Sequence, residues 1–239
     1  MENQNPNQKI IRHQHLDRPV EPVVDDPFSH EKMSAHIQKH VGPISYVLHE
    51  LVSDIIHVDI QVVLPTPERV FTTLITSGMS DRPMTTPKGQ ESRAYTELVL
   101  SLLPDWPLDE DSLRDERFYW PIRLLKTLAR FPHEYKTWLF AKHTIPNGDP
   151  PKAYSSDTEM CCALISEARC VRKEFWELKV SEQKNIYFLG VIPLYPEEME
   201  FKLKKGSAEL IKKLMENKIA EFLYQKRKRV CEKGLFGWK

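Results

Sequence analysis

The sequence predicts an α+β fold with a mixed or mostly antiparallel sheet. Segments with alternating or continuous apolar residues, typical of strands, outnumber segments with helical spacing. The two kinds do not alternate regularly, as they would around a parallel sheet. Neither an internal repeat nor a Gly/Ser-rich linker divides the 239 residues. We therefore expect one main domain.

The first elements follow an N-terminal segment without apolar periodicity. Residues 1–28 are rich in Asn, Gln, Pro and acidic side chains, which predicts a flexible arm. Ser29 is a suitable N-cap for a helix over residues 32–41, which Gly42 and the proline after it would end.

Three strands are predicted next. Residues 56–64 alternate apolar and polar side chains, and Pro65 ends the pattern. Residues 70–76 are rich in β-branched side chains and are close enough to form a hairpin with the first strand. A long loop over 78–89 leads to a third strand over 95–103.

A central helix is predicted over residues 118–130, where apolar residues recur at three- and four-residue spacing. Pro121 is tolerated near its first turn, and Pro132 should end it. The remaining elements are strands, a short helix, and a final helix that Ser207 caps and whose apolar stripe reaches Leu223. The strands are expected at 138–145, 160–165, 175–180 and 186–192, and the short helix at 197–204.

Composition excludes several classes of protein. The longest apolar runs hold about half of the ~20 residues that a membrane span needs. The N-terminus lacks the basic and apolar regions of a secretory signal, so we expect a cytoplasmic protein. The four cysteines, Cys161, Cys162, Cys170 and Cys231, fit neither a C-x-x-C metal site nor a disulfide framework.

The charges are unevenly distributed although the formal net charge is zero. Residues 202–239 hold 12 Lys and Arg against four Asp and Glu, so they carry +8 and residues 1–201 carry −8. The basic run at 226–229 lacks the interleaved aromatic residues of a single-strand platform. We therefore expect no nucleic-acid partner, and interpret residues 226–239 as a basic C-terminal tail, with a regulatory role for this tail as a further hypothesis.

No complete catalytic or cofactor motif is present. Eight glycines form neither G-x-G-x-x-G nor a P-loop, and His36 and His40 lie outside an H-E-x-x-H pattern, so no cofactor or metal is expected. Ser80 has only the first glycine of a nucleophile elbow, and local capping or turn formation is the preferred interpretation of this serine. A hydrolase that uses Ser80 with His57 or His143 remains the alternative function.

Five motifs in order resemble the suppressor of fused family over about residues 31–224. The first is the loop 77–84 (SGMSDRPM) directly after a strand. The others are Glu97-Leu98 leading to Leu103-Pro104 and Trp106; Trp120-Pro121 with Leu124-Leu125 and 128–132; 143–145 with Asn147-Gly148 and Pro150; and 192–195 with Glu198-Met199.

The resemblance implies a curved mixed sheet flanked by helices, here expected over residues 29–225, and a binding function. Animal members bind a transcription factor in Hedgehog signalling. Bacterial stand-alone members resemble immunity proteins that neutralise a toxin, and the absence of the animal protein's second domain favours this compact type. The family supplies no catalytic motif.

We therefore predict a non-catalytic protein-binding domain of an immunity- or antitoxin-like kind, with another protein as its partner and without a membrane or cofactor. Inhibitors of nucleic-acid-cleaving toxins are often acidic, and the net charge of −8 on residues 1–201 would speed encounter with a basic target. The candidate contact residues lie in the loop 78–89 and in the acidic loop 105–115, where core packing is the alternative for Trp106. They are Asp81, Arg82, Trp106, Asp109 and Asp111.

Overall fold

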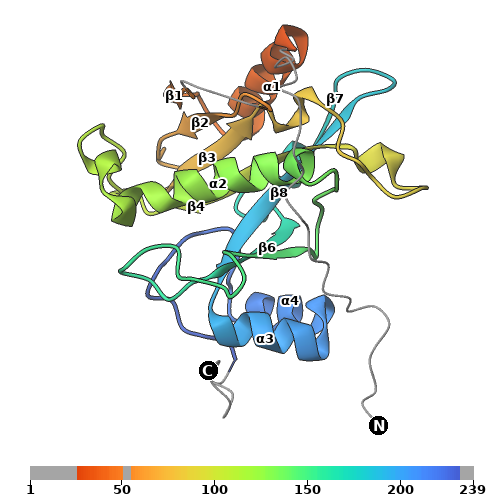
Figure 1. Ribbon diagram of the computed structural model, residues 1–239. Coiled ribbons are helices and arrows are strands. Elements are labelled where there is room, and N and C mark those ends of the chain that lie inside the picture. The colour runs from red at the N-terminus through yellow and green to blue at the C-terminus, as the bar shows by residue number, and fades with distance from the viewer. Residues whose placement is uncertain (1–25, 51–54, 232–239) are drawn as a thin grey trace.

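The structure is a computed structural model that describes residues 26–50 and 55–231 (Figure 1). It confirms the α+β fold, with a largely antiparallel open sheet and four helices in the described residues. The helices are α1 (Pro27–His40), α2 (Glu116–Glu134), α3 (Pro196–Lys205) and α4 (Ser207–Glu216). The strands are β1 (Tyr46–Leu48), β2 (Asp59–Val63), β3 (Thr72–Ser77), β4 (Tyr95–Leu102), β5 (Thr144–Pro146), β6 (Cys162–Glu167), β7 (Glu177–Lys179) and β8 (Asn185–Leu194).

The strands follow the order β1-β2-β3-β4-β8-β6-β5, and β7 also pairs with β8. Every pair is antiparallel except β4 with β8. β8 is the longest strand, and one of its edges is shared by β7 near the start and β6 along the rest. The C-terminal half of the chain is thereby attached to the N-terminal hairpins through the single parallel pair.

The sheet forks where β4 and β8 separate. Their pairing ends at Val99 and Gly190. Beyond this point the segment after α4 enters the gap, because the Ser101 amide donates to the Glu221 carbonyl and the Leu223 amide donates to the Ser101 carbonyl, each at 2.7 Å. Gly190 makes room, since a Cβ there would lie 3.0 Å from the Glu221 Cβ.

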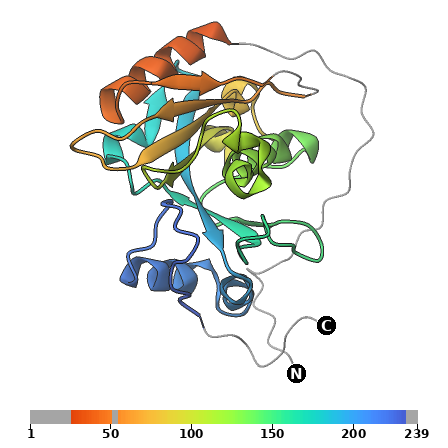
Figure 2. The ribbon, with the colours of Figure 1, turned by 90° about the vertical axis from the view of Figure 1, so that its left-hand side faces the viewer.

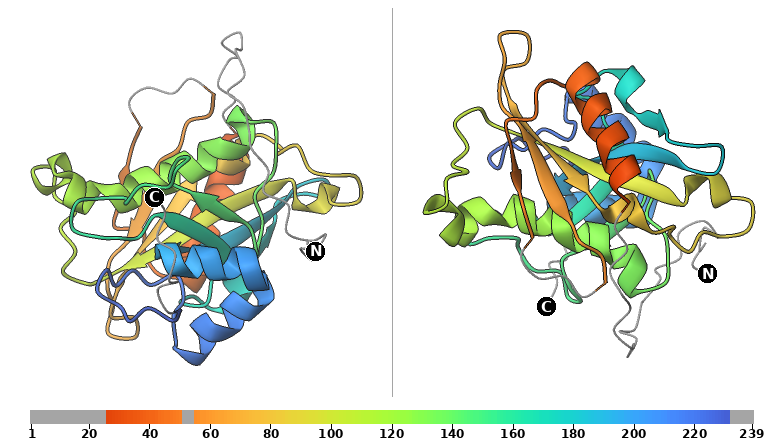
Figure 3. Two further views of the ribbon diagram at one scale, coloured as in Figure 1. Left: turned by 60° about the horizontal axis from the view of Figure 1, so that its bottom comes forward. Right: turned by 90° about the horizontal axis from the view of Figure 1, so that it is seen from above.

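Helices cover both faces of the sheet. α2 packs on one face over a core that includes Trp120 and Leu125, and α1 lies on the opposite side of the strands with Met33 and Ile37 (Figure 2). The hairpin of α3 and α4, side by side in the left view of Figure 3, covers a third cluster around Leu194. No helix in the described residues is long and apolar enough to cross a membrane.

Several predicted boundaries are corrected. α1 begins at Pro27 with Asp26 as its N-cap, so the expected Ser29 cap lies inside the helix, where its amide and hydroxyl both donate to Asp26. α2 continues through Pro132 to Glu134. The predicted strand at 138–145 is reduced to β5. Most of the predicted N-terminal arm, residues 1–25, lies outside the described residues.

The predicted final helix was wrong beyond residue 216. α4 ends at Glu216, and Lys218 adopts a positive φ of 57° that turns the chain away. Phe222 and Leu223 fit the helical stripe of the sequence, but in the structure they follow the turn into the fork of the sheet. β1 was not predicted at all, because three residues are too few to show a period.

Candidate functional site

The loop after β3 is organised by one fully buried carboxylate, that of Glu97 in β4. Its Oε1 accepts the Gly78 amide at 3.1 Å, the Ser80 amide at 2.9 Å and the Ser80 hydroxyl at 2.7 Å. Its Oε2 accepts the Thr76 hydroxyl at 2.5 Å. Burial raises the pKa of Glu97, and the hydrogen bonds from Thr76 and Ser80 counter that effect. The first two family-like motifs of the sequence therefore meet through a single side chain.

Gly78 allows this loop to turn. Its φ is +119°, and a Cβ at this position would lie 1.8 Å from the backbone oxygen of His57. Only glycine adopts such a backbone without strain. The short 3-10 turn Met79–Asp81 follows directly, which directs Ser80 inward to Glu97.

This geometry gives no support to the alternative hydrolase. The Ser80 side chain has no exposed surface, and its hydroxyl donates to Glu97 rather than to a histidine. The His57 Nε2 donates to Asp59 at 2.9 Å, and the Nδ1 of His143 accepts the Phe140 amide at 3.4 Å. A nucleophile must reach both a base and a substrate, whereas the Ser80 hydroxyl is fully buried and already donates to Glu97.

The two candidate contact residues of this loop differ in role. The Asp81 side chain is only 2% exposed, and its Oδ1 accepts the His30 Nε2 at 2.8 Å, which ties the loop to α1. Arg82 instead lines a hollow of about 370 Å³ beside the C-terminal end of α2. The loop is fixed to this end of the helix, because the His133 Nε2 donates to the Met79 carbonyl at 3.0 Å.

Trp106, Asp109 and Asp111 lie at the other end of α2. The indole of Trp106 is half-buried, donates to the Phe118 carbonyl at 3.1 Å and packs against the core. Asp109 accepts the amide and hydroxyl of Ser112, and these hydrogen bonds lower its pKa. Asp111 is 90% exposed.

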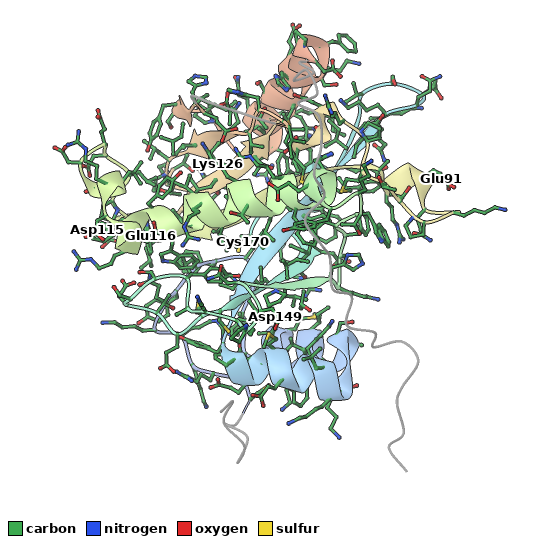
Figure 4. The ribbon with its side chains drawn as sticks, viewed as in Figure 1. Glu91, Asp115, Glu116, Lys126, Asp149 and Cys170 are labelled. Atoms are coloured by element: carbon green, nitrogen blue, oxygen red, sulfur yellow. The ribbon has the colours of Figure 1, made fainter. Side chains whose placement is uncertain are left out.

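The five candidate residues therefore do not form one surface. α2 has 19 residues, so its ends are about 28 Å apart at ~1.5 Å per residue. Figure 4 shows Asp115 and Glu116 at the acidic end of this helix. Asp115 caps it by accepting the Arg117 amide, and its pKa is lowered by the Arg117 side chain.

The first residues of the predicted basic tail are packed on α3. Arg227 donates to both carboxylate oxygens of Glu198, at 2.7 and 2.6 Å, and the two side chains are 7% and 0% exposed. Arg229 contacts Glu197 and Glu159. Two arginines of the basic run thus hold residues 226–231 onto the fold, and the rest of the tail lies outside the described residues.

The cysteines show no sign of a reactive site. Cys161 and Cys162 are buried among apolar side chains, and burial raises the pKa of Cys161 to about 11. All four thiols are free. Within residues 26–50 and 55–231, no group of three or more His, Cys, Asp or Glu residues is arranged to hold a metal ion.

Sequence reasoning did not assign a role to Glu97, Glu198 or Glu221. A signal existed for Glu97, because it is a charged residue at the start of a run of buried apolar residues, where an ionisable side chain needs partners. The sequence signal for Glu198 was weaker: it lies three residues after Tyr195, the spacing of a capping box. In the structure its carboxylate accepts the Tyr195 amide at 3.0 Å at the start of α3. No feature of the sequence around Glu221 indicated a structural role for this residue.

Comparison with known proteins agrees with this architecture. The family model described as "Suppressor of fused protein (SUFU)" matches residues 54–228. A crystal structure of a "SUFU (suppressor of fused protein) homolog from Neisseria gonorrhoeae FA 1090" superposes with a TM-score of 0.60 at 16% identity, and covers 85% of this chain and 97% of that chain. No curated protein matches the sequence.

Two further solved structures share the fold. The "Sufu-Fu complex" structure has a TM-score of 0.58 at 12% identity and covers 88% of this chain and 93% of that chain. Drosophila Suppressor of Fused has a TM-score of 0.57 at 12% identity; 84% of this chain is covered, but only 50% of the Drosophila chain. The family model spans well over half of the sequence, and the chain therefore belongs to the suppressor of fused family.

Proposed function

We propose that this chain is a non-catalytic protein-binding domain of the immunity or antitoxin type, which binds and neutralises a partner protein in the cytoplasm. The family match over residues 54–228 carries the proposal. One structure of the same fold is that of a complex, the "Sufu-Fu complex". The roles of the buried polar side chains agree with a non-catalytic domain, because Glu97, Ser80 and Glu198 hold loops and helix ends in place.

The acidic end of α2 is the surface that best fits a basic partner. Glu110 and Asp111 are 89% and 90% exposed. Hydrogen bonds lower the pKa of Asp109 and of Asp115, so both carboxylates stay charged at neutral pH. Glu110 and Asp111 both pair with Arg114, and Asp115 pairs with Arg117. Residues 105–117 nevertheless hold six acidic side chains against these two arginines, and a net negative surface raises the rate at which a basic protein is captured.

Trp106 supports this loop from beneath. Its N–H donates to the Phe118 carbonyl, and its ring meets the Phe118 ring edge-on at a centroid distance of 6.4 Å. The indole therefore fixes the start of α2 and the loop that carries Asp109 and Asp111. In this proposal Trp106 positions the acidic surface, and the carboxylates contact the partner.

The test uses the product of the neighbouring open reading frame, made as an inactive variant, and measures its affinity for this chain by calorimetry. Reversing two charges in D109K/D111K should weaken the complex by about tenfold or more and reduce its salt dependence. The control is E91K, which reverses an exposed charge on the opposite side of the molecule from Asp115 and Glu116 in Figure 4. Failure of the wild-type chain to bind would contradict the proposal, and equal loss in both variants would exclude this surface.

A further inference from the structure

The segment that enters the fork of the sheet connects two parts of the molecule. We call residues 219–227 the strap. It begins after α4, where the Ile219 amide donates to the Leu214 carbonyl at 2.8 Å and Lys218 turns the chain. In Figure 2 it rises from the hairpin of α3 and α4 to the sheet and returns. The strap thus enters the space between β4 and β8 where the pairing of these two strands has ended.

The strap is anchored at its end and crosses the sheet before it. At the end, Arg227 donates to both carboxylate oxygens of Glu198 in α3. In the middle, the Ser101 amide donates to the Glu221 carbonyl, and the Leu223 amide donates to the Ser101 carbonyl. The Leu223 side chain is buried in the core. Such a segment can open locally without unfolding of the whole domain.

A carboxylate that lacks a full set of hydrogen bonds lies under the middle of the strap. The Glu221 side chain has no exposed surface. Its Oε1 accepts the Cys170 amide at 2.6 Å, but its Oε2 has no hydrogen-bond partner among the described residues. The Ser101 hydroxyl oxygen is also buried without a partner in the described part of the chain. Closing the strap therefore buries polar groups whose hydrogen bonds with water are not fully replaced, which destabilises the closed form.

The described groups around Glu221 offer it no unpaired counter-charge. The Cys170 thiol lies beside the carboxylate, and burial raises the pKa of this thiol, so it stays neutral at physiological pH. Glu167 and Arg169 precede Cys170 and pair with each other at 3.2 Å. Gly190 brings β8 close, since a Cβ there would lie 3.0 Å from the Glu221 Cβ, but it adds no charge. Ionisation of Glu221 would therefore place a poorly compensated charge under the closed strap.

We propose that residues 219–227 form a releasable strap and that Glu221 is its proton-dependent catch. While Glu221 carries a proton, the closed strap buries a neutral side chain, and once the proton leaves, it buries a charge. Release uncovers the Ser101 amide and carbonyl at the edge of β4, which the strap now pairs.

The direction of the pH dependence follows from the same burial. Burial raises the pKa of Glu221, and the hydrogen bond from the Cys170 amide counters part of this effect. The closed strap therefore binds the proton more tightly than the open strap does. The contribution of Glu221 to closure is complete below the pKa of an exposed glutamate, about 4.3, and is lost as pH rises through the raised pKa.

Hydrogen exchange of the full chain, followed by two-dimensional NMR, tests the strap directly. The probes are the Leu223 and Cys170 amides, whose hydrogen bonds break when the strap opens. The reference is the Leu98 amide of β4, which donates to a buried hydroxyl of β3 at 2.8 Å. After correction for intrinsic rates, both probes should exchange about tenfold faster than Leu98 or more. Their protection should fall by about threefold or more between pH 4.5 and 7.

Two matched variants test the catch. E221Q keeps the shape of the side chain but cannot ionise, and E216Q removes an exposed carboxylate at the end of α4, shortly before the strap. The pH dependence of the Leu223 and Cys170 amides should be largely lost in E221Q and should remain in E216Q.

Two results would overturn the inference. Equal protection of the probes and of Leu98 would mean that the segment opens only when the whole domain unfolds. A pH dependence in E221Q equal to that of the wild type would mean that Glu221 is not the catch. If E221Q does not fold, the wild-type comparison still decides whether the strap opens alone. These measurements use no partner protein, so their failure would leave the proposed function intact.

Discussion

Replacing Glu97 tests how the loop after β3 is held. E97A removes the acceptor of four buried donors, from Thr76, Gly78 and twice from Ser80. Each buried donor left without a partner costs about 1–3 kcal/mol, and the cavity left by the side chain adds to this loss. With partial relief by water, we expect the free energy of unfolding to fall by about 4–6 kcal/mol, a large share of the total for a domain.

E97Q separates hydrogen bonding from charge. The side-chain carbonyl of the introduced glutamine can take the three bonds that Oε1 accepts. Its amide can donate to the Thr76 hydroxyl oxygen, which is 2.5 Å from the present Oε2. We therefore expect a loss of only about 1 kcal/mol. E91Q is the control at an exposed position and should change stability little, because glutamine can still accept the Gly89 amide.

Urea unfolding at pH 7, followed by tryptophan fluorescence, gives the three free energies. A loss in E97A below about 1 kcal/mol would refute the reasoning, because it would mean that the donors find other partners. A loss in E97Q as large as in E97A would show that charge, and not the hydrogen-bond pattern, holds the loop. If E97A does not fold, E97Q still decides between these two explanations.

Three further predictions concern single positions. G78A should lower the free energy of unfolding by about 3 kcal/mol or more, because the added Cβ would lie 1.8 Å from a backbone oxygen. G89A, at φ +84° with nothing within 4 Å of the added Cβ, should lower it by only about 1 kcal/mol. Thermal melts compare the two variants, and equal losses of stability would contradict this reasoning. Burial raises the pKa of Glu221, whose Oε2 has no hydrogen-bond partner among the described residues. A raised folded-state pKa means that the folded chain keeps this proton longer, so the Glu221 contribution to stability falls as pH rises above about 4.3. E221Q should flatten the decline in melting temperature between pH 4.5 and 7, and an unchanged profile would rule this out. R227A removes the ion-pair partner of the buried Glu198 carboxylate, so urea unfolding should show a loss of about 3–5 kcal/mol in the free energy of unfolding. R114A removes only exposed ion pairs and should change this free energy little. Similar losses in the two variants would argue against a structural role for the packed tail.

Much of the fold was predictable because its main elements carry clear periods. The strand over 95–103 and the helix over 118–130 were recovered within a few residues, since each buries a continuous face. The segment after residue 216 was not. Its apolar residues fit helical spacing, but Ser101 at the fork of the sheet offers backbone partners that a helix would leave unmet. A period along the chain carries no information about such a distant edge.

The candidate site was predicted only in part, for a similar reason. Asp81 and Arg82 are adjacent polar residues in a loop, and nothing in the sequence shows that His30 buries the first while the second lines a pocket. Glu97 and the loop it holds are about 20 residues apart, so their contact depends on the pairing of β3 with β4. The acidic loop was easier to predict, because consecutive charged residues such as Asp109, Glu110 and Asp111 are rarely buried together.

The proposed function is that this chain neutralises another protein by binding it. The most direct measurement is growth of cells that express the neighbouring gene product, with and without this chain. We expect growth arrest by the product alone, rescue by the wild-type chain, and loss of rescue in D109K/D111K at equal expression. A harmless gene product, or arrest that the wild-type chain does not relieve, would contradict it.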